Sequence, residues 1–218
     1  MEIDPKVLID PSYLEPRQTL IDPNRAAVRV EPGKFATATE TIYLSVADSD
    51  GNMVSFIHSI FGSFGSGVVV PGTGFVLQNR GAGFTLEDGH PNQVAPGKRP
   101  FHTLIPGFVT KSGQPLMAFG VMGGSMQPQG HVQVVLNMIE FGMDPQEAID
   151  AARFRHRGAL RVSVENMTPA LQEGLEALGH EIAPWQTTSY GGGQLVMRLE
   201  KGWAGASDPR KDGLAIGH

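Results

Sequence analysis

Thr41 is the residue of this chain whose position most suggests catalysis. It opens the first segment with strand character, TIYLSVAD, and it follows a proline-rich stretch with little periodicity. A threonine hydroxyl is a weak nucleophile unless a base removes its proton. Cleavage of the bond between Glu40 and Thr41 would create an α-amino group, with an ordinary pKa of about 8, on the same residue. The pattern therefore predicts autoprocessing that makes Thr41 an N-terminal nucleophile.

Gly123 and Gly124 are candidates for a site that stabilises developing negative charge. They lie directly before a segment with helical spacing. An oxyanion hole needs backbone N–H groups that no side chain obstructs, and the N-terminal dipole of a helix adds to their effect. A tight turn from strand to helix is the other interpretation of this glycine pair.

The elements that must position these residues begin with strands. The alternation in TIYLSVAD and MVSFIHS, separated by the turn sequence DSDGN, predicts a β-hairpin. Further apolar runs predict strands at residues 74–78, 103–110 and 116–121, and in the later segments RVSVE, QLVMRLE and GWAGAS. The catalytic domain is therefore expected to span residues 41–218. Residues 1–40 are interpreted as a linker with one short helix around residues 13–20.

Three longer segments predict helices. Asp144 with Pro145, and Thr168 with Pro169, have the residue types that cap and begin a helix. The helix that follows the glycine pair is expected to pack in the core through the apolar residues that recur with helical spacing, which are Val132, Val135, Leu136, Ile139 and Met143.

Composition excludes several classes of function. The net charge of -5 without a basic run argues against nucleic-acid or membrane-surface partners, and no apolar run is long enough to span a membrane. The absence of cysteine excludes disulfides, thiol catalysis and thiolate metal ligands. Dinucleotide, P-loop and Gly-x-Ser-x-Gly motifs are missing, and the histidines lack metal-ligand spacing. We expect no cofactor and no metal, and the compartment stays open between cytoplasm and periplasm.

Seven short motifs occur in one order along the chain. They are TIYLSVADSDGN from Thr41, FGSG at 64–67, NRGAGF at 79–84, PGKRP at 96–100, MGGS at 122–125, QEAIDAARFRH at 146–156 and GASDPR at 205–210. In these motifs the chain from Thr41 onward resembles the small subunit of the γ-glutamyltransferases. Residues 1–40 resemble the C-terminal tail of the large subunit, so the chain looks like a precursor fragment that crosses the processing site.

This resemblance implies a fold, a reaction and a partner. The fold is the α+β Ntn-hydrolase sandwich with αββα layers, to which this chain would contribute much of both sheets and one helical layer. The reaction is cleavage of γ-glutamyl amides such as glutathione, with transfer of the acyl group to water, an amino acid or a peptide. The partner is the large subunit of the same precursor. A chain without it would expose apolar surface and tend to associate, and a homo-oligomer is left open.

The resemblance also assigns catalytic roles. Thr41 matches the nucleophile, with its own amino group as general base. Ser59 matches a neighbouring hydroxyl position, usually Thr, that supports the nucleophile and the autocleavage step; an exposed strand serine is the alternative. Gly123 and Gly124 match the glycines whose N–H groups form the oxyanion hole.

The substrate-binding positions depart from the family pattern. Phe61 and Gly83 stand where an Asn and an acidic residue usually hold the α-amino group of the donor, so that clamp is expected to be lost. His102 and Thr103 replace paired serines that hold the α-carboxylate, so partial recognition of a carboxylate is expected to remain. Arg80, on the loop of Gly83, is a candidate to bind a carboxylate, with a surface arginine as the alternative.

The segment between Phe84 and Pro96 is shorter than in classical members of the family. By this resemblance, we expect a member without a lid and with an open pocket.

Two other interpretations of the function stay open. With the α-amino clamp missing, a related amide acylase of the cephalosporin-acylase type, with a different donor, is the rival within the class. An unprocessed, non-catalytic relative is the rival outside it.

Overall fold

The computed structural model describes residues 10–27, 40–184 and 190–217. These residues form two compact units, one of residues 40–153 with 190–217 and one of residues 10–27 with 154–184. Of the helices in these described ranges, none has the length and apolar character that a membrane crossing requires.

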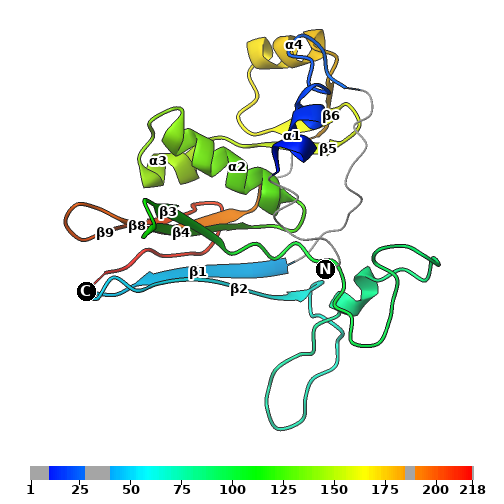
Figure 1. The fold of residues 1–218 in the computed structure, drawn as a ribbon, viewed down its shortest axis with the longest axis vertical. Helices are drawn as coiled ribbons and strands as arrows, with labels where there is room; N and C mark the ends of the chain where they lie inside the picture. Colours follow the sequence, from blue (N-terminus) through cyan, green and yellow to red (C-terminus); the bar gives the residue numbers. More distant parts are fainter. Residues whose placement is uncertain (1–9, 28–39, 185–189, 218) are drawn as a thin grey trace. The chain divides into compact units, whose positions relative to one another are not determined.

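The larger unit has three layers (Figure 1). A hairpin forms one layer, a four-stranded sheet in the order β3-β4-β8-β9 forms the middle one, and two helices cover the other face of that sheet. The elements are β1 (Glu40–Ala47), β2 (Met53–Phe61), a 3₁₀ turn η2 (Arg80–Gly83), β3 (Gly107–Lys111), β4 (Gln114–Met122), α2 (Met126–Ile139), α3 (Pro145–Asp150), β8 (Gly192–Arg198) and β9 (Trp203–Ser207). Two sheets and one helical layer agree with the expected contribution to an αββα sandwich.

The core of this unit lies between the four-stranded sheet and its helices. Each large apolar side chain buried there contributes about 1.5–3 kcal/mol of transfer free energy to folding. Its fully buried members are Met117, Phe119, Val121, Val134, Ala148, Ile149, Leu195 and Ala206.

The hairpin is confirmed, and local chemistry explains its turn. The backbone N–H of Asn52 donates to the Asp48 carboxylate at 2.9 Å, and Gly51 takes a φ of +88° that other residues rarely adopt. Alternation then divides the two faces of β1. Thr41 and Tyr43 are buried, whereas Ile42, Leu44 and Val46 are exposed.

The set of core residues predicted for α2 is correct only in part. Val135 and Met143 pack against the core, but Val132, Leu136 and Ile139 are exposed. Met126 and Val134 are fully buried instead. The reason is the close approach of α2 to β4, since a Cβ on Gly130 would lie 2.6 Å from a methyl carbon of Val121. The helix face that carries Gly130 and Val134 therefore packs on the sheet, whereas the side with Val132, Leu136 and Ile139 faces outward.

Two strand predictions also need correction. Residues 74–78 contain only an isolated bridge between Val69 and Val76, because a turn rich in glycine and proline keeps this segment short. The strand expected at residues 103–110 begins only at Gly107. Pro106 has no N–H to donate to a strand ladder, and the N–H of Ile105 donates instead to the side chain of Gln127.

The smaller unit is a short sheet with two helices. It holds α1 (Pro11–Gln18), β5 (Phe154–Gly158), β6 (Arg161–Val164), α4 (Pro169–Ala177) and β7 (Glu181–Ile182). β6 pairs antiparallel with β5 and parallel with β7. The predicted cap of α4 is confirmed, because the Thr168 hydroxyl accepts from the N–H of Leu171 at 3.2 Å. Asp144 caps α3 in the larger unit in the same way, through Glu147.

Candidate active site

Thr41 is the second residue of β1, and its side chain is buried at 4% exposure. Its Oγ1 atom has no hydrogen-bond partner among the described residues. A buried hydroxyl without a partner costs about 1–3 kcal/mol, so structural threonines usually bond to a neighbour. A buried threonine hydroxyl with no partner among the described residues is therefore unusual for a residue with a purely structural role.

The strand opposite Thr41 contains a β-bulge. Glu40 pairs with Phe61 and Ile42 pairs with His58, so two residue steps on β1 face three on β2. The extra residue lies in the stretch of Ser59 and directly faces Thr41. Phe61 takes a φ of +75°, a strained conformation for an aromatic residue. Bulges redirect side chains, and this one brings the Ser59 segment to the start of β1.

Gly123 and Gly124 follow the last residue of β4 and begin the turn into α2. Their φ values are +134° and +61°, and their carbonyls accept from the N–H groups of Met126 and Gln127 at 3.1 and 3.0 Å. A Cβ on Gly123 would lie 2.8 Å from the Cα of Gly191. The backbone here thus requires glycine both for its conformation and for its packing.

Two contacts show that β1 runs antiparallel to β4. The ring of Tyr43 lies over Gly120, where a Cβ would be 2.5 Å away, and its hydroxyl bonds to Ser55 at 2.7 Å. At the far end of the hairpin, Arg198 donates to the Gly51 carbonyl at 3.2 Å, beside the start of β4. The start of β1 and the end of β4 therefore lie toward the same end of the two sheets (Figure 1). Thr41 is the second residue of β1, and Gly123 directly follows β4.

Burial raises the pKa of Tyr43 to about 12, so its hydroxyl stays protonated at neutral pH. Its role is to hold β1 against β4.

A buried ionic network supports the backbone next to Gly123. The Asp208 carboxylate accepts from Arg153 Nη2 and from the N–H of Gly193, both at 2.7 Å. Arg153 Nη1 also donates to the Tyr190 carbonyl at 3.0 Å. The segment of residues 190–193, whose Gly191 packs on Gly123, is therefore held at Tyr190 and at Gly193. Sequence reasoning noted the GASDPR motif but missed this role, because nothing in the spacing links Arg153 to Asp208.

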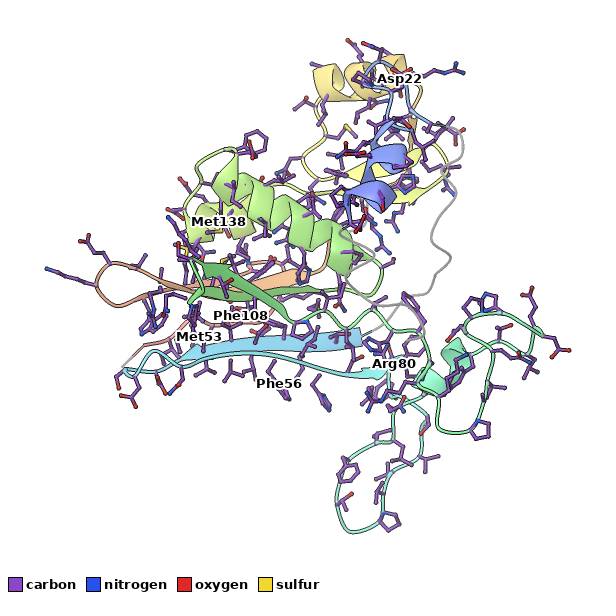
Figure 2. The ribbon with its side chains drawn as sticks, viewed as in Figure 1. Asp22, Met53, Phe56, Arg80, Phe108 and Met138 are labelled. Atoms are coloured by element: carbon purple, nitrogen blue, oxygen red, sulfur yellow. The ribbon has the colours of Figure 1, made fainter. Side chains whose placement is uncertain are left out.

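Arg80 joins the loop of η2 to the end of β2. Its Nη2 donates to Ser59 Oγ at 2.8 Å, and its guanidinium carbon lies 4.8 Å from the centre of the Phe61 ring. Figure 2 shows Arg80 beside the end of β2. The N–H of Gly62 donates to Asn79 Oδ1 at 2.8 Å and fixes the same junction. Arg80, Ser59 and Phe61, which the sequence analysis singled out separately, are in direct contact.

The loop of Gly83 and the loop of His102 are held together by Asn92. Its amide donates to the Gly83 carbonyl at 2.5 Å, and its Oδ1 accepts from the N–H of Phe101 at 2.8 Å. Sequence reasoning missed Asn92, since a loop asparagine carries no signal of a bridging role. The Thr103 hydroxyl, close by in sequence, is buried and finds no hydrogen-bond partner within the ranges that the structure describes.

His102 belongs to the exposed residues, yet part of it is shielded from water. This partial burial is the largest cause of its lowered pKa, and the positive charges of Arg80 and Arg99 lower it further. Its Nδ1 accepts from the N–H of Leu104 at 3.2 Å, which requires the neutral ring nitrogen. His102 is therefore a neutral hydrogen-bonding group in a region of positive potential. Within the described ranges, no group of three or more His, Asp or Glu side chains could hold a metal ion.

Comparison with known proteins agrees with these features. A family model described as γ-glutamyltranspeptidase matches residues 1–218. The chain is 36% identical to the glutathione hydrolase-like YwrD proenzyme of Bacillus subtilis, over 97% of this chain and 44% of that protein. It is also 36% identical to the oxamate amidohydrolase proenzyme of Klebsiella pneumoniae, over 100% of this chain and 42% of that protein.

A solved structure gives the same result. The cephalosporin acylase of Bacillus halodurans superposes with a TM-score of 0.89 and 44% identity, over 100% of this chain and 41% of that one. The expected α+β Ntn-hydrolase sandwich is thereby confirmed. The chain spans less than half the length of these relatives. The chain belongs to the γ-glutamyltranspeptidase family of enzymes.

Proposed function

We propose that Thr41 is the nucleophile of an N-terminal-nucleophile hydrolase, freed by cleavage of the bond that joins it to Glu40. The observation that carries this proposal is the buried Thr41 hydroxyl, which faces the bulge of Ser59 and has no hydrogen-bond partner in the described part of the chain. The proenzyme names of the relatives support the processing step.

In autocleavage, Thr41 Oγ1 attacks the Glu40 carbonyl carbon. The C–N bond breaks, the hydroxyl proton passes to the nitrogen, and an ester joins Glu40 to Thr41 until water hydrolyses it. Ser59 supports this step from β2. Phe61 pairs with Glu40, and its left-handed backbone costs about 1–3 kcal/mol, which places strain opposite the bond to be cut.

Turnover uses the amino group that cleavage creates. That group takes the proton of Thr41 Oγ1 as the oxygen attacks the amide carbonyl of the donor, and the N–H groups of Gly123 and Gly124 stabilise the oxyanion. The amine leaves with the proton, and an acyl ester remains on Thr41. Water or an amino group then attacks the ester and releases the acid or the transferred acyl group.

The leading donors are γ-glutamyl amides such as glutathione, and the proposed partner is a large subunit formed from the same precursor. The exposed apolar face of the hairpin supports a partner of this kind, since Ile42 is 66% and Phe56 is 48% exposed, and Phe56 points away from the four-stranded sheet (Figure 2). An amide acylase with another donor is the second candidate. It is favoured by Phe61 and Gly83 at the clamp positions and by the similarity to cephalosporin acylase.

Intact mass spectrometry of the full-length precursor tests the nucleophile. The wild-type protein should yield a fragment that begins at Thr41. Thr41→Ala should stay uncleaved and lose about 10⁴-fold or more of its activity toward γ-glutamyl-p-nitroanilide. Thr110→Ala, at an exposed position of β3, is the control and should behave as wild type. Cleavage or sustained turnover in Thr41→Ala would contradict the assignment, and turnover of glutaryl amides alone would favour the acylase.

A further inference from the structure

Arg80 is a buried cation that has no anionic partner among the residues the structure describes. The residue is 7% exposed, and within those residues its guanidinium donates only to the neutral hydroxyl of Ser59. Its Nη1 atom is buried and has no hydrogen-bond partner in the same part of the chain. Burial lowers the pKa of Arg80, but a guanidinium stays protonated at any physiological pH. A buried charge of this kind costs free energy that an incoming anion would recover.

The surroundings of Arg80 add positive rather than negative charge. His102 and the exposed Arg99 lie close enough that Arg80 and Arg99 both lower the pKa of His102. By contrast, Asp208 neutralises Arg153 at 2.7 Å in the supporting network. Arg153 is thus paired with a carboxylate, whereas no described carboxylate pairs with Arg80.

The position of Arg80 ties this charge to the proposed nucleophile. Arg80 bonds to Ser59, and Ser59 lies in the bulge that faces Thr41. The ring of Phe61 lies against the guanidinium at 4.8 Å, which offers an apolar surface to methylene groups. Gly83 has no side chain that could hold an ammonium group, and an ammonium would be repelled by Arg80.

We propose that Arg80 binds a carboxylate at the far end of the acyl donor, so that the enzyme acts on monoamides of dicarboxylic acids and does not need an α-amino group. This inference rests on Thr41 as the nucleophile. The planar guanidinium pairs with a carboxylate through two parallel hydrogen bonds, and Nη1 supplies the unused donor.

Three p-nitroanilides assayed with the full-length, self-processed protein test the proposal. Glutaryl-p-nitroanilide has the carboxylate, γ-glutamyl-p-nitroanilide has the carboxylate and the amino group, and pentanoyl-p-nitroanilide has neither. The glutaryl substrate should equal or exceed the γ-glutamyl one in kcat/KM. It should exceed the pentanoyl one on the order of 100-fold, the effect of hydrogen bonds to a charged group. Equal turnover of the pentanoyl and glutaryl substrates would overturn the proposal.

Variants separate binding from support of Ser59. Arg80→Gln should reduce the ratio of glutaryl to pentanoyl turnover on the order of 100-fold, and Arg80→Lys should reduce it less, because the charge remains. Ser59→Thr keeps a hydroxyl that can accept from Arg80 and support processing, so its ratio should match that of the wild type. The exposed Arg99→Gln is the control for net charge. If Arg80→Gln lowered the kcat toward all three anilides by the same factor and left the ratio unchanged, Arg80 would act only through Ser59 and the proposal would fail.

Failure of the underlying mechanism gives a different result. If wild-type protein released no fragment beginning at Thr41 and turned over none of the three anilides, the nucleophile itself would be wrong. If it was processed and preferred the γ-glutamyl substrate by tenfold or more over the glutaryl one, only the role of Arg80 as the main selector would be refuted.

Discussion

The strand end around Thr41 depends mainly on backbone geometry, whereas the loops around Arg80 depend mainly on side-chain contacts. At the strand end, the candidate groups are set by register and by backbone, through the bulge opposite Thr41 and the left-handed Gly123. In the loops, side chains define the chemistry, as Arg80 bonds to Ser59 and Asn92 bridges Gly83 to Phe101. A site made of backbone groups can serve a reaction that a whole family shares. Substitutions of loop side chains can instead change which acyl donor is bound without disturbing the sheets.

Substitutions at the strand end should have larger effects than substitutions in the loops. The largest loss of stability is expected for the Arg153–Asp208 ion pair that supports the strand end. In Asp208→Asn, Arg153 loses its buried counter-ion, and the free energy of unfolding of the uncleaved precursor should fall by about 3–5 kcal/mol. Denaturant unfolding measures this loss. The exposed Asp212→Asn is the matched control and should change stability by less than about 0.5 kcal/mol. Equal effects of the two changes would show that the network does not hold the strand end.

Gly123→Ala tests the backbone requirement directly. The added Cβ would meet Gly191 at 2.8 Å, and alanine at a φ of +134° is strained, so the N–H groups of the turn must shift. The kcat toward a hydrolysed anilide should fall about 10²- to 10³-fold. Gly72→Ala is the control, since Gly72 also has a positive φ but no atom within 4 Å of the added carbon. A similar kcat for both variants would argue against Gly123 in the oxyanion hole.

The loops should show a smaller, electrostatic response. After burial, the charge of Arg80 is a cause of the lowered pKa of His102. Removing that charge in Arg80→Gln makes protonation of the imidazole easier, so the pKa of His102 should rise and its ring should become charged at a higher pH. An NMR titration of the Thr41→Ala precursor measures this shift. Lys201→Gln, at an exposed position, should leave the pKa unchanged. An unchanged pKa in Arg80→Gln would mean that the two loops are not electrically coupled.

Local patterns in the sequence predicted local structure well. The hairpin, the caps at Asp144 and Thr168 and the helix after Gly124 all depend on residues close in sequence. The core residues of α2 were predicted only in part, because helical spacing shows that an apolar stripe exists but not which of its residues another element covers. Val132 and Leu136 form the regular stripe, yet close packing of Gly130 on Val121 decides the orientation of the helix.

By itself, the sequence determined the family, the hairpin that begins with Thr41 and the identity of the candidate side chains. These follow from residue types in a fixed local order. Only the tertiary structure decided that the Thr41 hydroxyl is buried, that a bulge faces it, and that Arg80 is buried against Ser59 and Phe61. The same holds for the finding that, among the described residues, Thr41 Oγ1 has no hydrogen-bond partner and Arg80 no counter-ion. Burial and pairing depend on which distant segments of the chain come into contact. Neither the spacing of residues nor the composition of the chain specifies those contacts.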